Sequence, residues 1–229
     1  MAASLKSGAR ALEWRHPPIN AECASASSEN YTEGPSGLSS ELATSLPIQR
    51  PKRADAARNY DKLLAAAREA FTSEGEDASL EGIARRADVG IGTLYRNFPT
   101  RQALLEAVYI EEVEGICRAA QEFEDEDPWQ ALTGWLARFA DYATTKKALA
   151  GELMAYMDED SEVFLHCRHA IKAAGAPLLE AAQRSGDVRA DVRFMDVVRM
   201  IGGIATIPNP EPGQVDRILA VALDGLRAR

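Results

Sequence analysis

Apolar residues recur every three or four positions through most of the chain after residue 50, which is the spacing of helices that bury one face. Strand-like alternation of apolar and polar residues is not convincing anywhere. The pattern predicts nine helices, the second of which begins after Ser79 and is short. The other expected ranges are 54–74, 91–98, 101–124, 128–144, 146–156, 160–185, 193–206 and 213–227. We therefore predict an all-α fold.

Residues that start or stop helices stand at the ends of these ranges. Gly75 follows the first range as a C-terminal stop, and Ser79 is positioned to cap the second. Thr100 is placed to cap the fourth range, and Pro128 opens the fifth at a first-turn position. Pro177 lies inside the seventh range, where we expect a kink.

Residues 1–50 differ from the rest of the chain. They show no sustained period and are rich in Ser, Ala, Glu, Gly and Pro, so we predict a disordered N-terminal tail. The remaining chain is expected to divide into a small helical domain at 51–105 and a larger one at 106–229.

The run 79–98 has the pattern of two short helices joined by a tight turn. Ala84 is small where a second helix must cross closely, Val89 is apolar just after the turn, and Leu94 lies one helical turn further on. This spacing is typical of a helix-turn-helix that enters the major groove of duplex DNA. The residues left facing outward on the second helix can donate hydrogen bonds to DNA. They are Thr93, Tyr95, Arg96 and Asn97.

The residues around this run resemble the DNA-binding domain of the TetR (tetracycline repressor) family over about 55–105. Gly-Thr-Leu-Tyr-Arg-Asn-Phe-Pro at 92–99, followed by the capping Thr100, is far more specific than a bare helix-turn-helix. The resemblance implies a homodimeric, usually repressing transcription factor. It also implies a helical C-terminal body, here 106–229, that binds a small effector and dimerises through its last two helices.

Two positions depart from the family pattern. Asp88 stands at the turn where glycine is usual, and aspartate tolerates the left-handed conformation at some cost. Gly82 replaces the acidic residue that would complete the capping box after Ser79. Both changes are expected to make the helix-turn-helix slightly less stable without preventing DNA binding.

Matching to the family motif places the expected DNA contacts on and beside the second helix of the run. Thr93 and Tyr95 would touch bases or phosphates, and Arg96 would reach a phosphate or a guanine edge. Tyr95 could instead pack under the next helix, and Arg85 or Arg86 could be plain solvated charge. The full set expected at the DNA is Lys52, Arg53, Arg85, Arg86, Gly92, Thr93, Tyr95, Arg96, Asn97 and Arg101.

A net charge of −9 is unusual for a DNA-binding protein, but the charge is unevenly distributed. Residues 51–105 carry 9 basic and 8 acidic side chains, whereas residues 106–229 carry 13 basic and 22 acidic ones. The acid is thus concentrated away from the helix-turn-helix, which suits a DNA-reading domain on a body with another role.

The larger domain holds aromatic and sulfur-containing residues that could line an effector cavity, although the same residues could fill an ordinary core. Glu162, His166 and His169 are spaced for one helix face, where a hydrogen-bonded cluster is favoured over a metal; we expect neither metal nor cofactor. Cys117 and Cys167 are expected to be inert buried thiols rather than a redox switch. The expected cavity residues are Trp135, Phe139, Tyr142, Met154, Met157, Phe164, Cys167 and Ile171.

The last two predicted helices each carry a small and apolar face, which predicts a four-helix interface between two copies of the chain. The expected partners are therefore double-stranded operator DNA, a second copy and an unidentified small-molecule effector. No stretch approaches the ~20 apolar residues of a membrane span, and scattered cysteines suggest a cytoplasmic protein.

The expected function is that of a sequence-specific transcriptional regulator, a homodimeric repressor that an effector releases from its operator. Alternatives are an activator, a DNA-binding protein without an effector, and, from another class, an enzyme on a helical body. Phosphate loops, dinucleotide turns, nucleophile elbows and zinc-helix signatures are not found, which argues against an enzyme.

Overall fold

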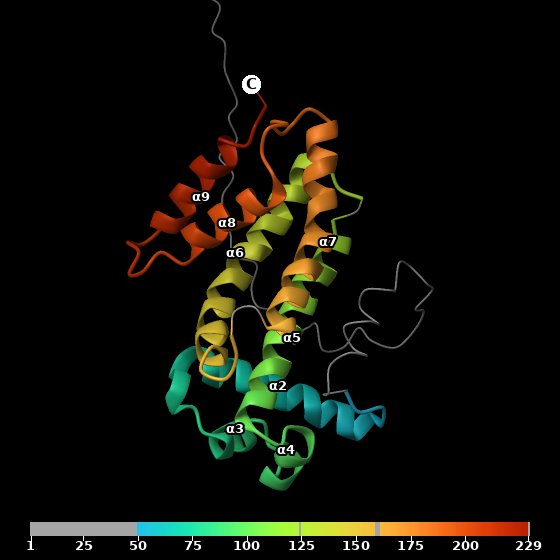
Figure 1. Ribbon diagram of the computed structural model, residues 1–229, viewed down its shortest axis with the longest axis vertical. Coiled ribbons are helices and arrows are strands. Elements are labelled where there is room, and N and C mark those ends of the chain that lie inside the picture. Colours follow the sequence, from blue (N-terminus) through green and yellow to red (C-terminus); the bar gives the residue numbers. More distant parts are fainter. Residues whose placement is uncertain (1–49, 124, 159–160, 229) are drawn as a thin grey trace, which may run out of the picture. The chain divides into compact units, whose positions relative to one another are not determined.

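The computed structural model describes residues 50–123, 125–158 and 161–228. The predicted tail at 1–50 lies outside them except for Arg50. The described residues are helical, without a named strand, so the all-α prediction is confirmed (Figure 1). The α-helices are α2 (Ala54–Glu74), α3 (Leu80–Arg86), α4 (Ile91–Asn97), α5 (Arg101–Gln121), α6 (Pro128–Leu153), α7 (Glu162–Arg184), α8 (Phe194–Ala205) and α9 (Gln214–Asp224); a short 3-10 helix, η2 (Gly75–Asp77), follows α2.

The helix ends are fixed by the residues that the sequence indicated. The Ser79 hydroxyl accepts a hydrogen bond from the Gly82 amide at 3.0 Å, so α3 is capped although the acidic half of the capping box is absent. The Thr100 hydroxyl accepts likewise from the Ala103 amide at 3.0 Å. These two caps set the starts of the helices on either side of α4.

The turn between α3 and α4 contains Asp88, which has a φ of 53°. The left-handed conformation that the sequence predicted for this position is confirmed. It is unfavourable for a residue with a Cβ, and aspartate reduces the cost without removing it.

Replacing Asp88 with Gly is therefore expected to raise the free energy of unfolding by about 1 kcal/mol. Thermal denaturation of the two proteins measures the difference. Asp77, exposed in η2 with negative φ, provides the matched control, because Asp77→Gly relieves no such strain and is not expected to stabilise. An unchanged or lowered melting temperature for the Asp88→Gly variant would contradict this account of the turn.

A single long helix, α6, spans the region where the sequence predicted two helices at 128–144 and 146–156. That prediction was wrong, because no glycine or proline lies between Trp135 and Ala150, where the break between the two helices was expected, and the apolar stripe continues. Leu149 and Leu153 are fully buried and extend the stripe by two further turns. Pro177 likewise lies inside α7 without ending the helix.

The core of the larger part lies between α5, α6, α7 and α8, with Trp135 at its centre. Its ring is fully buried, stacks on Phe139 at a centroid distance of 5.5 Å, and donates from Nε1 to the Ile116 carbonyl at 3.1 Å. Gly175 on α7 allows this close packing, because a Cβ there would approach the Trp135 ring to 2.5 Å.

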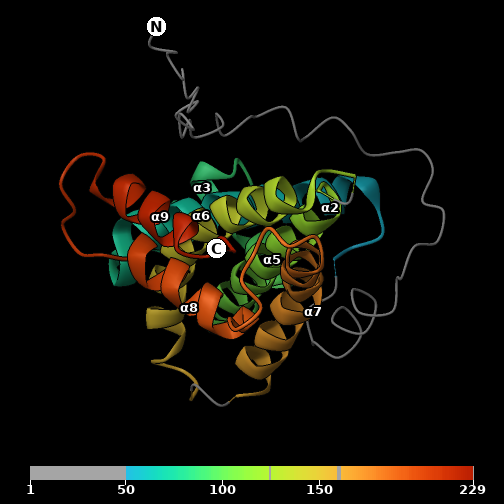
Figure 2. The same ribbon diagram turned by 90° about the horizontal axis from the view of Figure 1, so that it is seen from above.

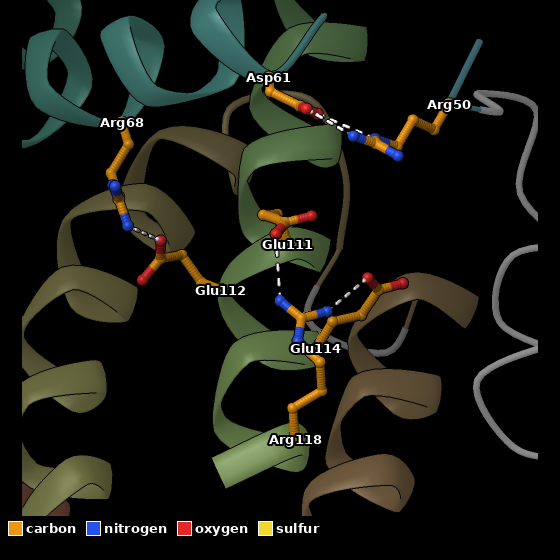
Figure 3. A network of polar contacts seen from close by, with 7 residues as sticks. All are labelled: Arg50, Asp61, Arg68, Glu111, Glu112, Glu114 and Arg118. Carbon is orange, nitrogen blue, oxygen red and sulfur yellow. Dashed lines mark hydrogen bonds and ion pairs between the residues drawn. The ribbon is translucent and has the colours of Figure 1, made fainter. Parts of the chain in front are cut away.

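One ion pair ties α2 to α5, and another holds the residue before α2 against α2 itself (Figure 3). Arg68 on α2 pairs with Glu112 on α5 at 3.0 Å, and the Glu112 carboxylate is largely buried. Arg50, just before α2, makes a two-point contact with Asp61 at 2.9 and 2.5 Å. The Arg68–Glu112 pair thereby helps to hold α2 on α5, the helix that continues into the larger part.

The last described residues lie beside the α7–α8 connection. The Ala228 amide donates to the Asp187 carbonyl at 3.0 Å, and the Arg227 guanidinium lies over the Trp129 ring at 4.0 Å. Figure 2 shows α8 and α9 running beside one another at one side of α6. No described helix has the length and apolar character needed to span a bilayer.

Candidate functional site

Helix α4 presents a polar face to solvent and is held from beneath by two buried side chains. Leu94 and Phe98 are fully buried, and the Phe98 ring packs on Tyr60 of α2 at a centroid distance of 5.0 Å. The helix is thereby fixed in rotation about its axis. Its remaining side chains project outward in one defined direction.

The predicted base-reading residues lie on that outward face. Tyr95 is 44% exposed and Arg96 is exposed, whereas Thr93 is half-buried. The alternative in which Tyr95 packs under the next helix is therefore not what the structure shows. Gly92 is exposed, and a Cβ there would meet no atom within 4 Å. The backbone of α4 is therefore accessible from solvent at this position.

Two of the α4 side chains fold back onto their own helix. The Asn97 amide nitrogen donates to the Thr93 carbonyl at 2.8 Å, and Asn97 is half-buried. The Arg96 Nε donates to the Gly92 carbonyl at 3.3 Å, a long bond that a phosphate or guanine can replace. Of the two, Arg96 is the better placed for DNA.

The other predicted cations differ in their freedom to reach a phosphate. Lys52, Arg53 and Arg85 are exposed, the first two immediately before α2. Arg86 is exposed too, but its guanidinium pairs with Glu74 at 2.5 Å. A phosphate contact from Arg86 would compete with that pair, which costs little to break at the surface.

Arg101 does not lie with these cations, although the sequence placed it at a phosphate. Its guanidinium donates to the carbonyls of Ala78 and Gly75 and pairs with Glu152 at 2.8 Å. It also lies over the Phe71 ring at 4.8 Å. The side chain is only 21% exposed and that of Glu152 10%, so Arg101 joins the helix-turn-helix unit to the end of α6.

A cavity of about 370 Å³ lies between α6, α7 and α8. That volume is in the range of small-molecule sites. The described residues that line it are Phe139, Ala143, Lys146, Lys147, Ala150, Arg168, Ile171, Met195, Val198, Arg199, Gly202, Gly203 and Thr206.

Two of the eight residues predicted for an effector cavity, Phe139 and Ile171, line this one. Met154 is 48% exposed at the end of α6, and Met157 accepts a hydrogen bond from the Ser161 hydroxyl beyond it. The other four are buried in the core without lining the cavity. They are Trp135, Tyr142, Phe164 and Cys167.

Neither the half-buried Cys117 thiol nor the buried Cys167 thiol is activated. Burial raises the pKa of the Cys167 thiol to about 12 and that of Cys117 to about 11, with nearby Glu114 adding to the shift for Cys117. Both are free cysteines, and at neutral pH both are protonated. Within the described residues, no cluster of three or more His, Cys, Asp or Glu side chains could hold a metal ion.

Sequence reasoning missed the four cations that line the cavity. Lys146 and Lys147 lie on α6 at the boundary between the helices predicted at 128–144 and 146–156. Because that boundary is absent, the two lysines share a helix face with Phe139 that the prediction did not show. Arg168 on α7 and Arg199 on α8 stand in no motif or spacing that the sequence analysis singled out. Two adjacent lysines in the acidic half of the chain were the available signal.

An all-helical chain in which a short, well-anchored helix offers a polar face after a tight turn defines a helix-turn-helix DNA-binding regulator. Residues 63–108 match the family described as bacterial regulatory proteins, tetR family. Residues 127–228 match the family described as transcriptional regulator SbtR-like, C-terminal domain.

Known proteins that are similar to this chain are also transcriptional regulators. A TetR transcriptional regulator, SCO0520 from Streptomyces coelicolor, is 44% identical over 73% of this chain and 98% of its own, with a TM-score of 0.64. A TetR transcription regulatory protein from Mycobacterium vanbaalenii is 36% identical over 78% and 100%, with a TM-score of 0.62. The HTH-type transcriptional regulator UidR of Escherichia coli (strain K12) is 26% identical over 61% and 74%. The chain belongs to the TetR family of DNA-binding transcriptional regulators.

Proposed function

We propose that the chain acts as a homodimeric repressor that binds an operator through α4 and is released by a small-molecule effector. In this proposal Thr93, Tyr95 and Arg96 read base edges. Phosphate contacts come from Lys52, Arg53 and Arg85, and sequence-independent affinity depends on them. Asn97 and Gly92 complete the α4 surface, and the proposal assigns no enzymatic activity to the chain.

The dimer is proposed to form through α8 and α9. On α9, one apolar side packs on α8 through Leu219, while Val221 on another side is 73% exposed. Ile218 and Ile204 are only half-buried. A second copy related by a two-fold axis would cover these residues in a four-helix interface. Such a dimer presents two copies of α4, which a two-fold operator requires.

One observation supports the effector part of the proposal most directly, namely the contact of α6 with both the cavity and the helix-turn-helix unit. Lys146 and Ala150 of α6 line the cavity, and Glu152 in the same helix holds Arg101. Arg101 in turn holds the carbonyls that end α2 and precede α3. A ligand that shifts α6 can therefore act on the placement of α4.

Transcription in vitro tests the repressor role. The template carries, across its promoter, a duplex selected for binding to the purified full chain. Addition of the chain is expected to lower the transcript. The Arg96→Ala variant should need about 10- to 100-fold more protein, because a base or phosphate contact is lost.

Lys172→Gln provides the control for this assay, since Lys172 is exposed on α7, away from α4. It is expected to repress like the parent chain. A transcript that rises on addition of the chain would identify an activator and overturn the repressor role. Equal repression by the Arg96→Ala variant would overturn the assigned role of α4.

A further inference from the structure

The charges around the cavity between α6, α7 and α8 are of one sign. Lys146 and Lys147 of α6, Arg168 of α7 and Arg199 of α8 line it, and no carboxylate is among the described lining residues. The surrounding segment, 106–229, carries 22 acidic and 13 basic side chains. The described lining residues are therefore opposite in charge to the acidic segment that contains them.

Lys146 is the most enclosed of these cations. It is half-buried and forms no ion pair with the residues that the structure describes. Burial lowers the pKa of its ammonium group, and the nearby Arg168 lowers it further. An anion in the cavity would supply the missing counter-charge.

The neighbouring lysine is held in place by the backbone. The Lys147 ammonium donates to the Thr206 carbonyl at 3.1 Å, at the end of α8. This bond leaves the ammonium with further donors. Arg199 lies on α8 about two helical turns before Thr206. It is exposed at the cavity and can turn its guanidinium toward the same ligand.

The rest of the cavity wall is apolar. Phe139, Ile171, Met195 and Val198 form this part, and Gly202 leaves space because a Cβ there would reach Phe139 only at 3.8 Å. A bare inorganic ion would leave this apolar wall wet, whereas a hydrocarbon body would cover it.

We propose that this cavity binds a small organic anion, with a carboxylate, sulfonate or phosphate head on the cations and an apolar body against Phe139 and Ile171. Calling this anion the effector rests on the function proposed above; the binding itself does not. The head lies between α6, α7 and α8 and ties the three helices together, and α6 carries the effect to Glu152.

Two fluorescent probes that differ in one charged group test the proposal. They are 1-anilinonaphthalene-8-sulfonate and its neutral analogue N-phenyl-1-naphthylamine, titrated into the purified full chain. The sulfonate is expected to bind with one site per chain and at least about tenfold more tightly than the neutral probe.

Variants locate the site. Lys146→Gln and Arg199→Gln are each expected to weaken sulfonate binding by about tenfold or more and to leave the neutral probe unchanged. Lys172→Gln, which removes an exposed cation from α7 outside the cavity, is the matched control and should change neither probe. Circular dichroism melting verifies that each variant is folded.

Equal binding of the two probes, or sulfonate binding that neither cavity variant weakens, would overturn the proposal. Displacement of the sulfonate by millimolar inorganic phosphate would overturn it too, because phosphate lacks the apolar body. Binding to the selected operator is measured in parallel. Charge-selective probe binding without specific DNA binding would refute only the regulator role, and the reverse result would refute only the anion site.

Discussion

Replacing Val221 with Glu is expected to dissociate the proposed α8–α9 dimer into monomers at micromolar concentration. Val221 is 73% exposed on α9, and a two-fold interface brings the two copies of a central residue close together. The substitution would therefore place two carboxylates in an apolar contact, and burial of unpaired charge is costly. Sedimentation velocity gives the oligomeric state, and we expect the dimer dissociation constant to rise about 100-fold or more.

Operator affinity should fall with the dimer. Two linked half-site contacts bind far more tightly than either one alone, so we expect about a 100-fold loss in a fluorescence-anisotropy titration. Ala173→Glu, at an exposed alanine of α7, adds the same charge away from α8 and α9 and should leave the dimer intact. A Val221→Glu variant that remained dimeric with full affinity would refute the assigned interface.

Replacing Arg101 with Met is expected to lower the free energy of unfolding by about 3 kcal/mol. The change leaves the largely buried Glu152 carboxylate without its cation. The Oε1 atom of Glu152 has no hydrogen-bond partner among the described residues, so the carboxylate would then have lost its ion pair as well. It also leaves the carbonyls of Gly75 and Ala78 without this donor. Urea denaturation measures the loss.

A substitution of Glu152 separates the cost of burying an unpaired charge from the cost of losing the Arg101 donor. Glu152→Gln retains an acceptor for Arg101 and should cost about 1 kcal/mol. Adding Glu152→Met to the Arg101→Met variant should recover part of the loss, because the buried unpaired charge is removed. An Arg101→Met variant within 0.5 kcal/mol of the parent would contradict the connection between α6 and the helix-turn-helix unit.

The helix-turn-helix could be predicted from sequence because its determinants are local. Ser79 and Thr100 cap helices within three residues, and Asp88 takes up the backbone conformation that its place in the turn demands. Apolar spacing fixed which face of α4 is buried. The contacts that Arg101 makes within the chain could not be predicted because its partners are not local: Glu152 lies 51 residues away in the chain.

The cavity could not be predicted from sequence for the same reason. Trp135 and Phe139 belong to one apolar stripe of α6, yet Trp135 fills the core and Phe139 lines the cavity. Which of them meets open space depends on the packing of α7 and α8, where Gly175 admits one ring and Gly202 leaves a gap. Periodicity identifies a buried face without showing how completely it is filled.

Selection from random duplex DNA with the purified full chain tests the central claim most directly. If the chain is a two-fold regulator that reads DNA through α4, the enriched sequences will be near-palindromic, with half-site centres about 34 Å apart, or a small multiple of one helical turn. The Arg96→Ala variant should then lose affinity for the winning sequence, and binding should weaken steeply with salt. Uniformly weak binding with no enriched sequence would contradict the account.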